Sequence, residues 1–91
     1  MTKIEFISFG LIGWQDYSYW KIQDKKTLKK IDSLIIEIFR SPFVGIGKPE
    51  PLIGDLAGYW SRRINDKERL VYKVAGNTVF IAKCRGHYGD K

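Results

Sequence analysis

The sequence predicts one α+β domain over residues 1–91, with an N-terminal strand and two helices packed on an antiparallel sheet. Three observations support this fold class. Apolar residues recur at three- and four-residue intervals between Leu28 and Phe39, as on one face of an amphipathic helix. Three strand-like segments follow later with short connections, which is typical of an antiparallel meander. A chain of 91 residues has room for one hydrophobic core but not for two.

The first elements are predicted to be a strand and a helix. Residues 3–8 alternate in part between apolar and polar side chains, which indicates a short strand. Residues 11–23 carry apolar side chains at helical spacing. Gly10 and Gly13 should weaken the start of this helix, because an interior glycine costs about 1 kcal/mol relative to alanine.

The second helix is the clearest element of the sequence. Asp24 is a suitable N-cap residue, so we expect the helix to begin at Lys25. It should end at Ser41, because the residue before Pro42 avoids helical backbone angles. The lysines of its polar face are expected to be solvated rather than bound to RNA. The apolar stripe consists of Leu28, Ile31, Leu34, Ile35, Ile38 and Phe39.

The second half of the chain is predicted to be a long loop followed by three strands. Residues 42–58 contain all three prolines and four of the nine glycines, so this segment should be mostly loop. A tight turn is expected at Gly76 and Asn77. The strands are predicted at residues 59–64, 69–74 and 78–85.

Composition narrows the class of partner. The net charge of +6 and the pI near 9.6 favour a polyanion such as nucleic acid, although an acidic protein would fit the charge as well. Cys84 is the only cysteine and is expected to be a buried structural thiol, and with one histidine no metal site or other cofactor is predicted. Lys3 and Glu5 near the start, and the lack of a long apolar segment, predict a cytoplasmic protein with no membrane span.

Arginines mark a candidate anion site. Arg62 and Arg63 are adjacent in one predicted strand, and Arg69 begins the next. If Arg63 lies opposite Arg69, both side chains leave the same face, where like charges would repel unless they bind a phosphate. Another register would separate them, and the arginines could instead form surface ion pairs. We predict that Arg62 and Arg63 contact RNA or phosphate.

A carboxylate and a histidine complete a possible set of groups for cutting RNA. Glu50 stands between two prolines that restrict its backbone, and could act as a general base beside Lys48, which should contact RNA. It could equally be an ordinary loop residue. His87 can donate or accept a proton near neutral pH, although a lone histidine near a terminus is usually inert. Tyr88 could stack on a base or belong to the core.

Four joined motifs resemble the YoeB/Txe family, toxins of bacterial type II toxin–antitoxin pairs within the RelE-like group. They are Gly-x-Gly-Lys-Pro-Glu-Pro-Leu (45–52), Leu-x-Gly-Tyr-Trp-Ser-Arg-Arg-Ile (56–64), Arg-Leu-Val-Tyr (69–72) and Cys-Arg-x-His-Tyr (84–88). The resemblance covers almost the whole chain in one order. It implies the RelE-like microbial RNase fold and an endoribonuclease that cuts mRNA in the ribosomal A site without a metal.

The resemblance also implies roles for individual residues. Glu50 would be the general base for a ribose 2′-hydroxyl, and Arg69, with help from Arg63, would stabilise the charge that develops on the phosphate. His87 would protonate the leaving 5′-oxygen, and Tyr88 would orient the phosphate or the base. The implied partners are a cognate antitoxin, mRNA, the ribosome with its 16S rRNA at the A site, and a second copy in a homodimer.

Three departures and two alternatives accompany the resemblance. One departure is the weak start of the first helix at Gly10 and Gly13. Family members often carry lysine where this chain has Ile53, and often end at the His-Tyr pair, whereas this chain continues through residues 89–91. A non-catalytic toxin on the same fold would either occlude the ribosomal A site or inhibit gyrase, as ParE-like proteins do. Those relatives generally lack the Glu/Arg/His/Tyr set that is present here.

Overall fold

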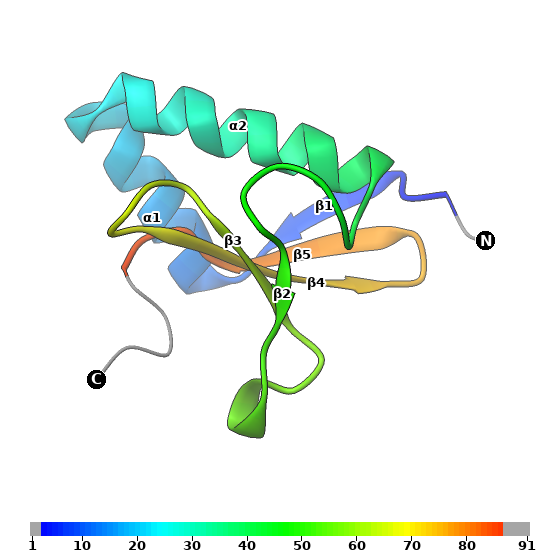
Figure 1. The fold of residues 1–91 in the computed structure, drawn as a ribbon. Helices are drawn as coiled ribbons and strands as arrows, with labels where there is room; N and C mark the ends of the chain where they lie inside the picture. The colour runs from blue at the N-terminus through cyan, green and yellow to red at the C-terminus, as the bar shows by residue number, and fades with distance from the viewer. Residues whose placement is uncertain (1–2, 87–91) are drawn as a thin grey trace.

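The computed structural model describes residues 3–86 (Figure 1). In this part of the chain a strand precedes two helices, and four strands and one short 3₁₀ helix follow. The elements are β1 (Phe6–Phe9), α1 (Leu11–Gln23), α2 (Lys25–Arg40), β2 (Glu50–Pro51), η1 (Gly54–Leu56), β3 (Trp60–Arg63), β4 (Arg69–Ala75) and β5 (Thr78–Lys83).

The sheet has five strands in the order β1-β5-β4-β3-β2. The predicted meander of β3, β4 and β5 is confirmed, with a turn at Gly76 and Asn77. β1 lies parallel to β5, so the sheet is mixed rather than wholly antiparallel. The two helices form the crossover between β1 and the rest of the sheet, which is the connection that a parallel pair requires.

β2 was not predicted, because its segment was assigned to loop. Pro49 and Pro51 lack the N–H that a central strand needs, but an edge strand tolerates proline. β2 is an edge strand and pairs only with β3 among the described strands. Leu52 donates its N–H to Tyr59 O (2.9 Å) and extends this hairpin, which projects below the sheet in Figure 1.

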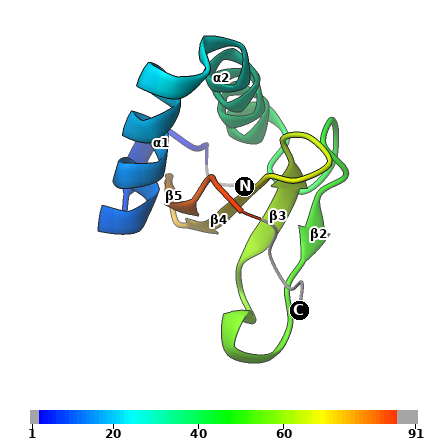
Figure 2. The ribbon, with the colours of Figure 1, turned by 90° about the vertical axis from the view of Figure 1, so that its left-hand side faces the viewer.

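Both helices lie on one side of the sheet (Figure 2). α2 has the predicted bounds and the predicted cap: one Asp24 carboxylate oxygen accepts from the N–H groups of Lys26 and Thr27. Its stripe faces the sheet and forms most of the core, together with side chains from α1, β4 and β5. The fully buried apolar members of this core are Ile31, Leu34, Ile38, Leu70, Tyr72, Val79, Ile81 and Cys84.

α1 also has the predicted bounds, and small and large residues share its buried face. Leu11 and Trp14 are exposed, whereas Gly13 and Trp20 are buried. A β-carbon on Gly13 would lie closer than 3.0 Å to the carbonyl oxygen of Ile81 in β5. The glycine that lowers helix propensity therefore allows α1 to pack directly on the backbone of the sheet.

Candidate active site

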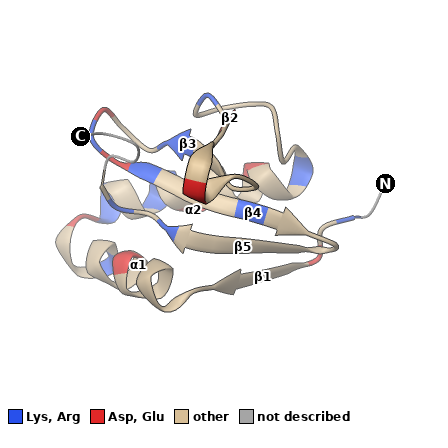
Figure 3. Ribbon diagram, turned by 90° about the horizontal axis from the view of Figure 1, so that it is seen from below, with Lys and Arg blue, Asp and Glu red and all other residues tan. Residues whose placement is uncertain are grey.

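The register of β3 and β4 places Arg63 directly opposite Arg69, as one reading of the sequence predicted. Successive strand residues face opposite sides of a sheet. The neighbouring pair, Arg62 and Leu70, is fully buried beneath the helices. Arg63 and Arg69 therefore leave the face without helices. Figure 3 views this side and shows Lys and Arg positions on β3, β4 and β5.

The guanidinium group of Arg69 is held by the loop between β3 and β4. Its Nη1 donates to the carbonyl oxygens of Asn65 (2.7 Å) and Glu68 (3.1 Å). The Asn65 side chain in turn accepts from the N–H groups of Lys67 (2.8 Å) and Glu68 (2.9 Å), which fixes the loop. Arg69 is half-buried and oriented, whereas Arg63 opposite is exposed.

Glu50 lies on the same face as the two arginines. It is the cross-strand partner of Ser61, which precedes Arg63 by two residues on β3. Directly opposite residues have Cβ atoms about 5 Å apart, and diagonal neighbours are about 7–8 Å apart. The structure thus places an exposed carboxylate and two arginines on one face of three adjacent strands.

The prediction that Arg62 contacts RNA or phosphate is wrong, because Arg62 is buried. Its side chain has no exposed surface, and the guanidinium group donates to three backbone carbonyls and to the Tyr72 hydroxyl. The alternation of the strand contained the signal: once Arg63 faces outward opposite Arg69, Arg62 must face the core. Lys48 is exposed, with a left-handed backbone (φ 50°), and its predicted contact with RNA stays a prediction.

The comparison with known families decides the identity. A family model described as the YoeB-like toxin of bacterial type II toxin–antitoxin systems matches residues 9–88.

The chain belongs to the YoeB toxin family.

Individual members agree with this assignment. The toxin YoeB of Streptomyces coelicolor is 54% identical over 82 residues, which are 90% of this chain and 98% of that protein. The structure of the YoeB dimer from Staphylococcus aureus has a TM-score of 0.87 at 46% identity, covering 94% of this chain and 99% of that one. A YoeB–YefM heterotetramer from the same organism has a TM-score of 0.85 at 46% identity, covering 93% of this chain and 98% of that one. The predicted family and fold are confirmed.

In this YoeB toxin the segment that leads to His87 is attached to the start of β4. The backbone N–H of Gly86 donates to a carboxylate oxygen of Glu68 (2.5 Å), and the N–H of Arg69 donates to Gly86 O (2.9 Å). The sequence reading did not find this role for Glu68. His87, Tyr88 and residues 89–91 lie outside the described residues, so their assignments stay predictions.

Cys84 is the buried structural thiol that was predicted. Burial, followed by the nearby carboxylate of Asp16, raises the pKa of this thiol to about 12. The N–H of Cys84 donates to Asp16 Oδ2 (3.0 Å), and its carbonyl accepts from Trp20 Nε1 (2.8 Å). α1 therefore holds the end of β5.

Residues 3–86 lack two kinds of feature. No cluster of three or more His, Cys, Asp or Glu side chains there could hold a metal ion. No helix of this region has the length and apolar character that crossing a bilayer requires.

Proposed function

We propose that this YoeB toxin is a ribosome-dependent endoribonuclease that cleaves mRNA in the A site and so inhibits translation. One observation supports this most directly: Glu50, Arg63 and Arg69 share the face of the sheet without helices. Two guanidinium groups directly opposite one another repel. A phosphodiester bound there offsets this repulsion.

The reaction requires no group beyond the side chains and the RNA itself. Glu50 takes the proton of a ribose 2′-hydroxyl, and the oxygen attacks the adjacent phosphorus. In the pentacoordinate phosphorane that this attack forms, the phosphate oxygens carry more negative charge than they do in the phosphodiester before attack. Arg69, oriented by two loop carbonyls, and Arg63 opposite stabilise that charge through charge-assisted hydrogen bonds.

The C-terminal pair completes the proposal. His87 protonates the leaving 5′-oxygen, and Tyr88 orients the phosphate or the base. The products are a 2′,3′-cyclic phosphate and a 5′-hydroxyl. The attachment of Gly86 to the first residue of β4 supports this assignment, because it brings the chain to the arginine pair just before His87. Lys48 is assigned to the RNA backbone.

Partners follow from the charge and from the relatives. The S. aureus structures are of a YoeB dimer and of a YoeB–YefM heterotetramer. We assign to this chain a YefM-type antitoxin whose acidic groups complement its charge of +6, and a homodimeric state. Its substrate places its action in the cytoplasm, on translating ribosomes.

The test is single-turnover cleavage of mRNA on ribosomes stalled with a defined A-site codon. Glu50→Gln should slow cleavage by about 100-fold or more, the usual contribution of a general base. Asp55→Asn removes an exposed carboxylate of η1 and should leave the rate unchanged. An mRNA with a 2′-deoxy sugar at the scissile position should not be cut.

Each other outcome has a definite meaning. Cleavage of the 2′-deoxy mRNA would exclude attack by the 2′-oxygen. Arrest of translation without new 5′ ends would establish the A-site occluder instead. Inhibition of DNA supercoiling by gyrase, with translation intact, would establish the ParE-like alternative.

A further inference from the structure

We infer that Arg62 is a positioning residue that sets the place of Glu50 by holding the α2–β2 loop, residues 41–49. This inference rests on the proposed function, because it assumes that Glu50 takes the proton. Arg62 does not touch the substrate in this assignment. It acts through the backbone that carries the carboxylate.

The guanidinium group of Arg62 binds three carbonyls of one loop. Nη2 donates to Ser41 O (2.5 Å) and Val44 O (3.0 Å), and Nη1 donates to Ile46 O (3.1 Å). Nε donates to the hydroxyl of Tyr72 (3.2 Å). The planar fork of arginine presents these donors in fixed directions, which a lysine ammonium cannot reproduce.

Tyr72 extends the same arrangement to a fourth carbonyl. Its hydroxyl accepts from Arg62 and donates to Pro42 O (2.7 Å). Both side chains are fully buried, and the described part of the chain contains no buried side-chain nitrogen or oxygen without a partner. The carbonyls of residues 41, 42, 44 and 46 thus all point inward, toward Arg62 and Tyr72.

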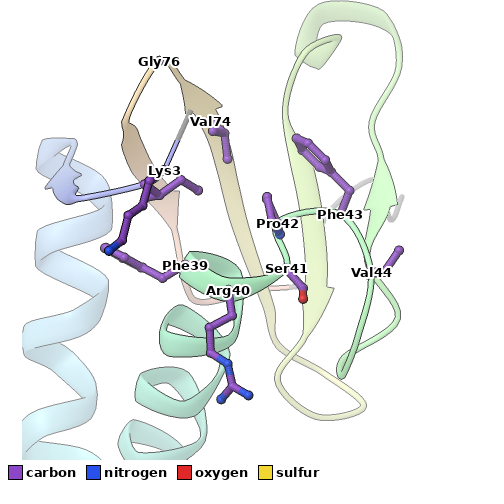
Figure 4. Close-up of a pocket in the computed structure, with 10 residues that line it drawn as sticks. Lys3, Phe39, Arg40, Ser41, Pro42, Phe43, Val44, Val74 and Gly76 are labelled. Carbon is purple, nitrogen blue, oxygen red and sulfur yellow. The ribbon is translucent and has the colours of Figure 1, made fainter. Parts of the chain in front are cut away.

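The apolar side chains of this loop point the other way. Phe43, Val44 and Ile46 are 45%, 66% and 48% exposed. Figure 4 shows Pro42, Phe43 and Val44 on the wall of a groove beside the C-terminal end of α2. Apart from the contact of the Phe43 ring with Trp60 (4.7 Å between centroids), little apolar burial fixes the loop, so the buried guanidinium group is its main anchor.

The loop leads directly to Glu50. Gly47, three residues before Glu50, accepts at its carbonyl oxygen from Arg63 N (2.7 Å). A β-carbon on Gly47 would lie 3.1 Å from Cβ of Arg62, so this part of the loop packs closely on β3. The prolines on either side of Glu50 have no N–H to give to the sheet. β2 has only two residues, so the orientation of Glu50 depends on how the chain is held on either side. The bond from Leu52 N–H to Tyr59 O holds one side, and the loop that Arg62 binds holds the other.

The experiment compares Arg62→Lys with Ile31→Val in the same cleavage assay. Arg62→Lys should slow single-turnover cleavage by roughly 10- to 100-fold, as expected when a reacting group is misplaced by about 1 Å. Its affinity for the stalled ribosome should stay unchanged. Ile31→Val removes a methylene group from the core on α2, away from the loop that Arg62 holds, and should lower Tm. This variant should cleave at the wild-type rate.

Amide hydrogen exchange separates a local effect from a global one. In Arg62→Lys exchange should rise in the loop but not in β4. Tyr72→Phe, which frees only Pro42 O and removes one acceptor, should show smaller changes in the same direction and serves if Arg62→Lys fails to fold. Equal loss of protection in β4, or faster loop exchange with an unchanged cleavage rate, would overturn the inference.

A double variant distinguishes this inference from the proposed function. If Arg62 acts through Glu50, adding Arg62→Lys to Glu50→Gln should cause no further loss. Losses that multiply would show that Arg62 acts independently of Glu50. Wild-type cleavage by Glu50→Gln alone would overturn the general-base assignment. In that case slow cleavage by Arg62→Lys would show that the loop positions another group, and the inference about Glu50 would fall with the assignment.

Discussion

Replacing Gly13 with alanine should destabilise the protein, although the same change stabilises most helices. Helix propensity alone favours alanine by about 1 kcal/mol. At this position the added methyl group would meet the carbonyl carbons of Ile81 (3.2 Å) and Ala82 (3.3 Å), and it would lie still closer to the Ile81 oxygen. These are backbone atoms of a central strand and cannot rotate away, so α1 must shift.

The size of the effect follows from the contacts that such a shift strains. Overpacking of this kind costs about 1–3 kcal/mol. The shift also lengthens the bonds from Asp16 and Trp20 to Cys84, and a hydrogen bond to a charged group contributes about 1.5–3 kcal/mol when intact. If the bond to Asp16 is lost, the two costs less the gain in propensity leave a net loss of about 1.5–5 kcal/mol. Each kcal/mol lowers Tm by about 4–8 °C in a domain of this size.

Urea unfolding followed by tryptophan fluorescence measures this loss. Gln15→Ala, on an exposed position of the same helix, is the matched control and should leave stability unchanged or slightly higher. A Gly13→Ala variant as stable as the wild type would refute the reasoning. The contact of α1 with the β5 backbone would then not be as close as described.

Three further predictions concern the anchors around Cys84 and Gly86. Burial raises the pKa of the Cys84 thiol to about 12, so this thiol should resist iodoacetamide at pH near 8 in the folded protein and react at once in urea. Mass spectrometry measures the labelling. Rapid labelling of the folded protein would contradict the prediction. Burial also raises the pKa of Asp16, so the folded state keeps a proton that the unfolded state has lost just above pH 3.8, and stability due to this group falls as pH rises. Unfolding curves between about pH 4 and 6 should show that Asp16→Asn has lost this slope, and an unchanged slope would assign it elsewhere. Glu68→Ala should slow the proposed mRNA cleavage, because the N–H of Gly86 loses its acceptor. Glu68→Gln keeps an acceptor oxygen and should cleave at close to the wild-type rate. Wild-type rates for both variants would remove Glu68 from the site.

Local signals in the sequence were sufficient for the helices. The Asp24 cap and the stripe of α2 fixed its start and its buried face, because cap and periodicity act within one or two turns. In α1 the apolar spacing did not indicate the buried face, because that face depends on the contact of Gly13 with a strand 68 residues later in the chain. Propensity could only mark that glycine as a weakness.

The candidate site could be predicted only where it depends on the pairing of neighbouring strands. The meander and its short connection made the pairing of Arg63 with Arg69 one of few registers, and it is the register found. The role of Arg62 depends on carbonyls from residues 41–46, whose direction no local pattern encodes. β2 was missed because two prolines in a short segment indicate a loop unless a partner strand is known.

The parallel pairing of β1 with β5 sets an order of events during synthesis. β1 is made before every other described element, whereas its partner, β5, is made after them. The sheet therefore stays incomplete until residue 83 has been made, and the anchors at Cys84 and Gly86 form only after that. The order of the elements along the chain thus delays completion of the sheet until the last described strand has been synthesised.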